Sequence, residues 1–272
     1  KDPGEMYSIF PVDNTKPYDM TEIIERIVDA SADGVSSFDQ YKEDYGKTIL
    51  CGYARIDGWA VGIVANQRKI VKTRKGEMQM GGVIYNDSSD KAARFILNCN
   101  QKKIPLVFLQ DVTGFMVGSR SEHAGIIKDG AKLVNAVANS VVPKITIVVG
   151  NSYGAGNYAM CGKAYDPRFI YGWPTAKIAV MGGEQAAKVL LQAQVKGLQA
   201  KGETISKEKE TALLDEIKSR YERQTTPYYA AARLWVDAII DPLQTRTVIS
   251  EAIAAANHQP VIREFKTGVF QV

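Results

Sequence analysis

KIPLVFLQDVTGFMVG (residues 103–118) and KITIVVGNSYGAGNYAMCG (residues 144–162) are the stretches that decide the fold. Each contains an apolar run of strand length that leads into a glycine-containing loop, and a helical pattern lies between the two. Repetition of strand, loop and helix is typical of an α/β fold. Loops that follow the strands of such a fold expose backbone amides, so we expect both to face a ligand.

The flanking sequence predicts further elements of the same fold. The dipeptide Asp57-Gly58 splits residues 48–66 into two strands of an antiparallel hairpin. Helices are predicted over 20–29, 87–101, from 183 onwards and over 246–256, and strands over 169–172, 178–181 and 233–241. A helix that ends near residue 140 carries one apolar face, made of Ile127, Ala131, Val134, Ala138 and Val141.

Three segments allow more than one interpretation. Residues 1–17, rich in Pro, Asp and Gly, are predicted to form an extended arm or linker before a domain at 18–272. The basic residues between 67 and 90 form either a phosphate-binding patch or a solvated loop. Beyond Lys196 we expect a long charged helix with an apolar stripe made of Leu213, Leu214, Ile217 and Tyr221. Either this stripe packs on a second copy of the chain, giving at least a dimer, or the helix is an ordinary surface helix.

Composition excludes several classes of protein. The chain has 272 residues, of which 45% are hydrophobic and 24% charged, as in soluble globular domains. A net charge of +4 is too small to indicate a nucleic-acid partner. Three cysteines fit neither a disulfide framework nor a zinc site, and two histidines exclude a His-rich metal centre. Since no apolar run is long enough to span a membrane, we expect a cytoplasmic or mitochondrial-matrix protein.

The second glycine-containing loop is the best-supported candidate for a catalytic site. Gly154, Ala155 and Gly156 follow a strand and open a helix, where free N–H groups and the helix dipole favour an oxyanion; alternatively they only permit tight packing. The loop does not match a nucleotide-binding glycine pattern. A hydrolase triad is disfavoured, because Ser152 lacks the nucleophile elbow, and the candidate acid Asp111 lacks a neighbouring carboxylate.

A longer stretch, from about Ile104 to Ala187, resembles the C-terminal half of biotin-dependent acyl-CoA carboxylase β subunits. It contains FLQDVTGFMVGSRSEHAGIIKDGAKLVNAVANSVVPKITIVVGNSYGAGNYAMCGKAYDPRF (residues 108–169). The opening, residues 10–29, resembles the start of the same half. GFMVG, AGIIKDGAK and GAGNYAMCGKAYDPRF are most similar to the 3-methylcrotonyl-CoA branch. One departure is VKTRKGEMQMGGVIYNDSSD, which is longer than the corresponding turn of that branch.

This resemblance implies a crotonase-type (ClpP/crotonase-like) fold, a ββα superhelix. It also implies that the chain is a carboxyltransferase, the component of a ligase that moves CO2 from carboxybiotin to an acyl-CoA through a biotin enolate. Its implied partners are the N-terminal carboxyltransferase half, which binds the acyl-CoA, and a biotin carboxylase and biotin carrier subunit, in an oligomer without membrane or nucleic acid. The implied residues are Ala155 and Gly156 as the catalytic oxyanion hole; Gly154, Thr113, Gly114 and Phe115 as biotin-binding residues; and Tyr158 as an acyl-specificity residue.

Two other functions stay open at this point. One is an inactive crotonase-fold fragment that serves only in assembly. The other is a stand-alone acyl-CoA hydratase or hydrolase, which the lack of a glutamate pair facing the amide loops disfavours.

Overall fold

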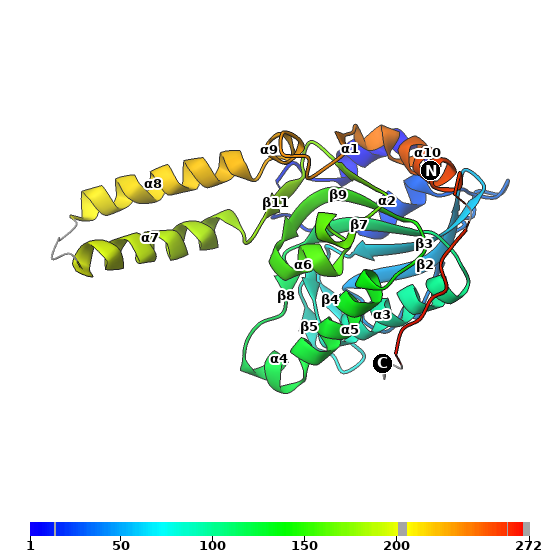
Figure 1. The fold of residues 1–272 in the computed structure, drawn as a ribbon, viewed down its shortest axis with the longest axis horizontal. Helices are drawn as coiled ribbons and strands as arrows, with labels where there is room; N and C mark the ends of the chain where they lie inside the picture. The colour runs from blue at the N-terminus through cyan, green and yellow to red at the C-terminus, as the bar shows by residue number, and fades with distance from the viewer. Residues whose placement is uncertain (14, 201–205, 260, 269–272) are drawn as a thin grey trace.

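An eight-stranded mixed sheet lies at the centre of the computed structural model, which describes residues 1–13, 15–200, 206–259 and 261–268 (Figure 1). Its hydrogen-bonded order is β1-β2-β3-β7-β9-β10-β12, and β11 extends the pairing along β9. The strands are β1 (Asp39–Gln40), β2 (Ile49–Ile56), β3 (Trp59–Asn66), β7 (Leu106–Val112), β9 (Lys144–Tyr153), β10 (Phe169–Gly172), β11 (Lys177–Ala179) and β12 (Ala238–Ile239).

The predicted hairpin is confirmed as the antiparallel pair β2–β3. Asp57 and Gly58 both adopt positive φ, at 52° and 78°, which is the conformation of the tight hairpin turn that this dipeptide favours. The Asp29 carboxylate accepts both turn N–H groups at 2.8 Å. From β3 onward the pairs β3–β7, β7–β9 and β9–β10 are parallel, so the carboxyl ends of β7 and β9 lie at one edge of the sheet.

Helices cover both faces of the sheet (Figure 1). On one face lie α2 (Met20–Ile27) and α10 (Thr245–Ala256), whose buried residues share a core cluster with Leu109, Ile147 and Trp173. On the other lie α3 (Asn86–Gln101) and α5 (Ile126–Ala138), which pack on Phe108 and Val64. The helices expected over 20–29, 87–101 and 246–256 are therefore confirmed.

Helix α5 is apolar on two faces. Its buried residues are Ile126, Gly130, Leu133, Ala136 and Val137. The face expected from the sequence is present, but it is the more exposed one: Ile127 is 77% accessible. Burial of one apolar face leaves the second available to line a site.

The N-terminal residues differ from the extended arm predicted for 1–17. They contain η1 (Pro3–Glu5) and α1 (Met6–Ile9), and they bury Met6 and Phe10 in the core that surrounds Trp173. Two apolar side chains four positions apart share one side of a helical turn, which explains how so short a segment packs. The domain boundary at residue 17 stays a prediction.

Residues 67–90 also differ from a solvated loop. They form two small sheets: β4 (Val71–Lys72) pairs antiparallel with β5 (Met78–Gln79), and β6 (Val83–Ile84) pairs parallel with β8 (Gly114–Phe115). Arg68 is buried and forms an ion pair with Asp111. Only part of the basic segment is therefore exposed to solvent.

Helices α7 (Gly183–Ala200) and α8 (Lys207–Gln224) form an arm that projects from the body (Figure 1). The stripe on α8 is used within the chain: Leu213, Leu214 and Ile217 pack against α7, and the Tyr221 hydroxyl donates to the Met181 carbonyl at 2.8 Å. Its packing on a second copy is therefore not supported, and the stripe is no argument for a dimer.

Short helices complete the fold: α4 (Ser119–His123), α6 (Gly154–Ala159), η2 (Lys163–Tyr165), α9 (Pro227–Ala231) and η3 (Pro242–Gln244). The strand expected over 233–241 is reduced to β12, because a turn follows α9 and ends in Leu234 at positive φ. Among the described residues, no helix has both the length and the apolar character needed to cross a membrane.

Candidate functional site

The two glycine-containing segments meet at the carboxyl ends of β7 and β9. Strand β9 runs to Tyr153, and α6 begins at once with Gly154. Gly154 has φ of +53°, and a Cβ atom there would lie 2.8 Å from the Val180 carbonyl oxygen. Glycine therefore permits the abrupt change from strand to helix at this position.

Gly156 lies where α6 touches the other segment. A Cβ atom at Gly156 would lie 2.6 Å from Cγ2 of Val112 and 3.2 Å from Cα of Gly114. This contact confirms that Gly156 permits tight packing, one of the two roles considered for it. The N–H groups of a first helical turn have no partner within the helix, so the packing leaves the oxyanion role open.

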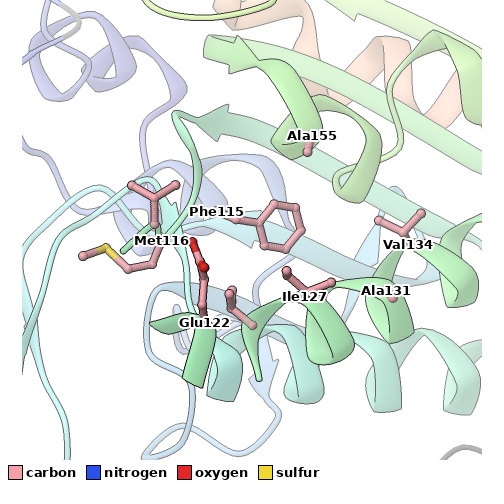
Figure 2. A pocket seen from close by; sticks show the side chains of 10 residues that line it. Phe115, Met116, Glu122, Ile127, Ala131, Val134 and Ala155 are labelled. Atoms are coloured by element: carbon pink, nitrogen blue, oxygen red, sulfur yellow. The ribbon is translucent and has the colours of Figure 1, made fainter. Parts of the chain in front are cut away.

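A pocket of about 370 Å³ opens beside α6. Figure 2 shows the Phe115 ring between Ala155 above and the exposed face of α5 below. Of the ten described residues that line the pocket, Glu122 alone is charged. The lining is Phe115, Met116, Val117, Glu122, Ile126, Ile127, Gly130, Ala131, Val134 and Ala155.

The structure places the predicted site residues unequally. Phe115 and Ala155 line the pocket, with Ala155 exposed. Gly114 and Gly156 do not line it, but they lie close together, since a Cβ atom on Gly156 would lie 3.2 Å from Cα of Gly114. Thr113 is exposed, and both its N–H and its hydroxyl donate to the Gly82 carbonyl, at 2.8 and 3.1 Å.

Tyr158 lies outside the pocket lining. It is 47% exposed, and its ring contacts the edge of Tyr165 with centroids 5.7 Å apart. An acyl-specificity role for Tyr158 therefore stays a prediction that requires a second surface to face it.

Sequence reasoning missed the α5 side of the pocket. The sequence predicts Ile127, Ala131 and Val134 as one helical face, and the structure shows that this face lines the pocket. Their spacing was the available signal, since apolar residues on an exposed helix face indicate contact with a ligand or partner.

Polar side chains of β7, β9 and α6 form a hydrogen-bond network that supports α6. The Ser152 hydroxyl, fully buried, donates to Gln110 Oε1 at 2.6 Å and accepts from Asn157 Nδ2 at 2.7 Å. Gln110 Nε2 in turn donates to the Met160 carbonyl at 2.6 Å. Ser152 is therefore a structural hydrogen-bonding group, as the missing nucleophile elbow indicates.

A buried carboxylate lies next to this network. Asp111 is 1% exposed; it accepts a hydrogen bond from the Tyr18 hydroxyl at 2.9 Å and lies 3.3 Å from Arg68 Nε. Burial raises the pKa of Asp111, while Arg68 acts in the opposite direction. Burial likewise raises the pKa of Tyr18 well above its usual value. The neighbours of Asp111 are thus a guanidinium and a phenol rather than a second carboxylate.

The described residues give little support for a catalytic cysteine or for a metal site. All three cysteines are buried, and burial raises the pKa of Cys161 to about 11 and that of Cys51 to about 12. Within the described part of the chain, no group of three His, Cys, Asp or Glu side chains is arranged to hold a metal ion. The site therefore offers backbone amides, apolar walls and one carboxylate.

Comparison with known proteins places the chain in a family. A family model described as a carboxyl transferase domain matches residues 1–269. A biotin-dependent 3-methylcrotonyl-coenzyme A carboxylase beta1 subunit from Mycobacterium tuberculosis (strain ATCC 25618 / H37Rv) is 47% identical over 99% of this chain and 47% of its own length.

Solved structures give the same result. The P. aeruginosa geranyl-CoA carboxylase beta subunit superposes with a TM-score of 0.80 at 39% identity, over 100% of this chain and 48% of that one. A transcarboxylase 12S hexamer with methylmalonyl-coenzyme A bound gives a TM-score of 0.81 at 35% identity, over 98% and 47%. The expected crotonase-type α/β fold is confirmed. The chain spans about half the length of these relatives.

Proposed function

The chain belongs to the carboxyl transferase domain family, and from this premise we propose that it is the C-terminal carboxyltransferase half of a biotin-dependent acyl-CoA carboxylase β subunit. The observation that carries the proposal is the apolar pocket that opens beside Ala155 at the start of α6. Its volume of about 370 Å³ is that of a small-molecule site, and its apolar walls suit the fused rings of biotin.

When bound, carboxybiotin would supply the CO2 that joins the acyl carbon and the ureido nitrogen that accepts the acyl-CoA proton. The chain's own groups hold the ring during this exchange. The N–H groups of Ala155 and Gly156 donate to the ureido oxygen as negative charge grows on it. Phe115 and the exposed face of α5 enclose the ring and exclude water, which strengthens those hydrogen bonds.

The substrate we propose is 3-methylcrotonyl-CoA or a related branched, unsaturated acyl-CoA. Support comes from the identity to the M. tuberculosis 3-methylcrotonyl-CoA subunit and from the geranyl-CoA carboxylase neighbour. Tyr158, an exposed residue of α6, is the residue we expect to contact the acyl group.

An N-terminal carboxyltransferase half is the partner we propose for the open side of the site, with a biotin carboxylase and carrier subunit delivering carboxybiotin. Exposed apolar side chains surround the opening: Val117 is 78% and Met116 36% accessible, next to Ile127. Such an apolar rim favours a protein partner. The hexamer formed by transcarboxylase 12S supports an oligomer, and the compartment stays the cytoplasm or the mitochondrial matrix.

Two measurements test the proposed function. The subunit that contains this chain should transfer the carboxyl group from carboxybiotin to 3-methylcrotonyl-CoA. The chain alone should bind biotin, seen as shifts in the NMR signals of Phe115 and Ala155, without turnover. Hydration or hydrolysis of an acyl-CoA by the chain alone would instead support a crotonase-type hydratase or hydrolase. Absence of both binding and transfer would support an assembly fragment.

Ile127→Glu tests the pocket itself. We expect biotin affinity to fall at least ~10-fold, because the ring would bury a carboxylate without a partner. Stability should change by no more than about 0.5 kcal/mol, because the position is exposed. Asn135→Glu is the matched control, since it adds the same charge at an exposed position of α5 outside the pocket. Equal affinities of the two variants, measured by calorimetry, would contradict the assignment of biotin to this pocket.

A further inference from the structure

Strand β9 bulges directly opposite Asp111. In the β7–β9 ladder Gln110 pairs with Val148 and Val112 with Ser152, so three residues of β9 face one of β7. The Asp111 carboxylate occupies the bulge: Oδ1 accepts the Asn151 N–H at 2.9 Å. A Cβ atom on Gly150 would lie 2.5 Å from the carboxylate carbon, so the neighbouring backbone lies directly on this group. Such bulges redirect a strand, and here α6 begins three residues later.

The second carboxylate oxygen connects Asp111 to other parts of the chain. Oδ2 accepts from the Tyr18 hydroxyl at 2.9 Å and faces Arg68 Nε at 3.3 Å. The Asp111 N–H donates to Asn66 Oδ1 at 3.1 Å, at the end of β3. Through its carboxylate and its backbone N–H, one buried residue therefore joins Tyr18, β3, β7 and β9.

Arg68 extends this network to the opposite wall of the site. Its guanidinium lies against Gly82, where a side chain would collide with Nη1. The Gly82 carbonyl accepts the N–H and hydroxyl of Thr113, which leads into β8 and Phe115. Both walls of the pocket are thus connected to the Asp111–Arg68 pair. The wall that contains Ala155 is connected through the bond between Asp111 and Asn151 of β9, and the wall that contains Phe115 through the close approach of Arg68 to Gly82 and the bonds of Gly82 with Thr113.

We propose that Asp111 is a positioning residue for carboxyl transfer, which fixes the separation between the start of α6 and the 113–115 segment through the β9 bulge. The inference rests on the proposed function, since the reaction that Asp111 supports is carboxyl transfer. It assigns Asp111 no contact with biotin. It explains why a charged pair is buried here: bonds to a carboxylate are stronger and more directional than those between neutral groups.

Asp111→Asn is the informative variant, because it keeps the shape and removes the charge. In the complete subunit we expect kcat to fall on the order of 100-fold, the loss that a displacement of about 1 Å causes at an oriented site. The KM for acyl-CoA should stay within about twofold, because most of the proposed acyl-CoA site lies in the other half. Tyr18→Phe, which removes one hydrogen bond and no charge, should change kcat in the same direction by less.

Asp29→Asn provides the matched control. Asp29 also accepts two backbone N–H groups and pairs with an arginine, Arg246, but it holds the β2–β3 turn at the opposite end of the sheet. It should lower the melting temperature without lowering kcat per folded molecule. Hydrogen exchange at residues 151–159 should accelerate in Asp111→Asn and not in Asp29→Asn.

These outcomes separate the inference from the proposed function. Normal kcat in folded Asp111→Asn, or an equal loss in Asp29→Asn, overturns the positioning role. If the unmodified subunit transfers no carboxyl group, the proposed function fails. Hydrogen exchange then decides the inference: selective acceleration at 151–159 supports the positioning of α6, and equal exchange in both variants overturns it. If Asp111→Asn does not fold, Tyr18→Phe replaces it in both measurements.

Discussion

Gly156→Val is expected to lower carboxyl transfer by the subunit that contains this chain at least ~100-fold, on the scale of about 3 kcal/mol for one lost oxyanion donor. Acyl-CoA affinity should change little, because the N-terminal half is proposed to bind that substrate. The sequence alone predicts this result with the fold largely intact. The structure adds a second effect, because the new side chain points at Val112.

A Cβ atom 2.6 Å from Val112 Cγ2 must push α6 away from β7, and overpacking of this kind destabilises a protein by about 1–3 kcal/mol. The loss of activity could then come from the displacement of α6, or from the new side chain blocking the approach of biotin to the Gly156 N–H. The pair Gly156→Ala with Val112→Ala separates the two, because the second change makes room for the added methyl group. Recovery of stability without recovery of turnover would assign the loss to the oxyanion hole.

Carboxylation rate and melting temperature, measured on the same sample, decide between these effects. Gly197→Val is the control, since a side chain there has nothing within 4 Å in the arm helix α7, and it should leave turnover unchanged. A stable Gly156→Val subunit with near-normal turnover would remove the oxyanion role. Full recovery of turnover in the double variant would leave Gly156 only its packing role.

The sheet and its two loops could be predicted because their signals are local. Apolar runs such as 106–109 and 145–149 become buried strands, and Asp57-Gly58 determines its own turn. The pocket could be predicted only in part. Periodicity finds an apolar face on α5, but Ile126 and Ile127 are adjacent in sequence, and only the tertiary structure buries Ile126 and leaves Ile127 exposed.

The support beneath the site could not be predicted for a different reason. Asp111, Arg68 and Tyr18 are far apart in sequence, and none has a neighbour that signals its partner. Charge patterning therefore places Arg68 in a phosphate-binding patch or a solvated loop, whereas the fold brings it to a buried carboxylate. The three residues are visible in the sequence, but their pairing is a property of the tertiary structure.

Composition also concealed the role of the N-terminal segment. Pro, Asp and Gly between residues 1 and 17 are typical of a linker, yet Phe10 is only 7% exposed. Its ring lies 4.9 Å from Tyr18 and 5.3 Å from the buried Trp173, measured between centroids. Because Tyr18 also donates to Asp111, the segment lies against the same side of the sheet as the support of the site.

Phe10→Ala should therefore lower the free energy of unfolding by about 3–5 kcal/mol, the usual loss for a buried phenylalanine that leaves a cavity. In a domain of this size such a loss lowers the melting temperature on the order of 10 °C. Val12→Ala, at a side chain that is 91% exposed two positions later, should leave both quantities nearly unchanged. Urea denaturation of both variants checks the difference. Equal stabilities would show that residues 1–17 act as a linker, whereas the predicted difference would make them part of the carboxyltransferase fold.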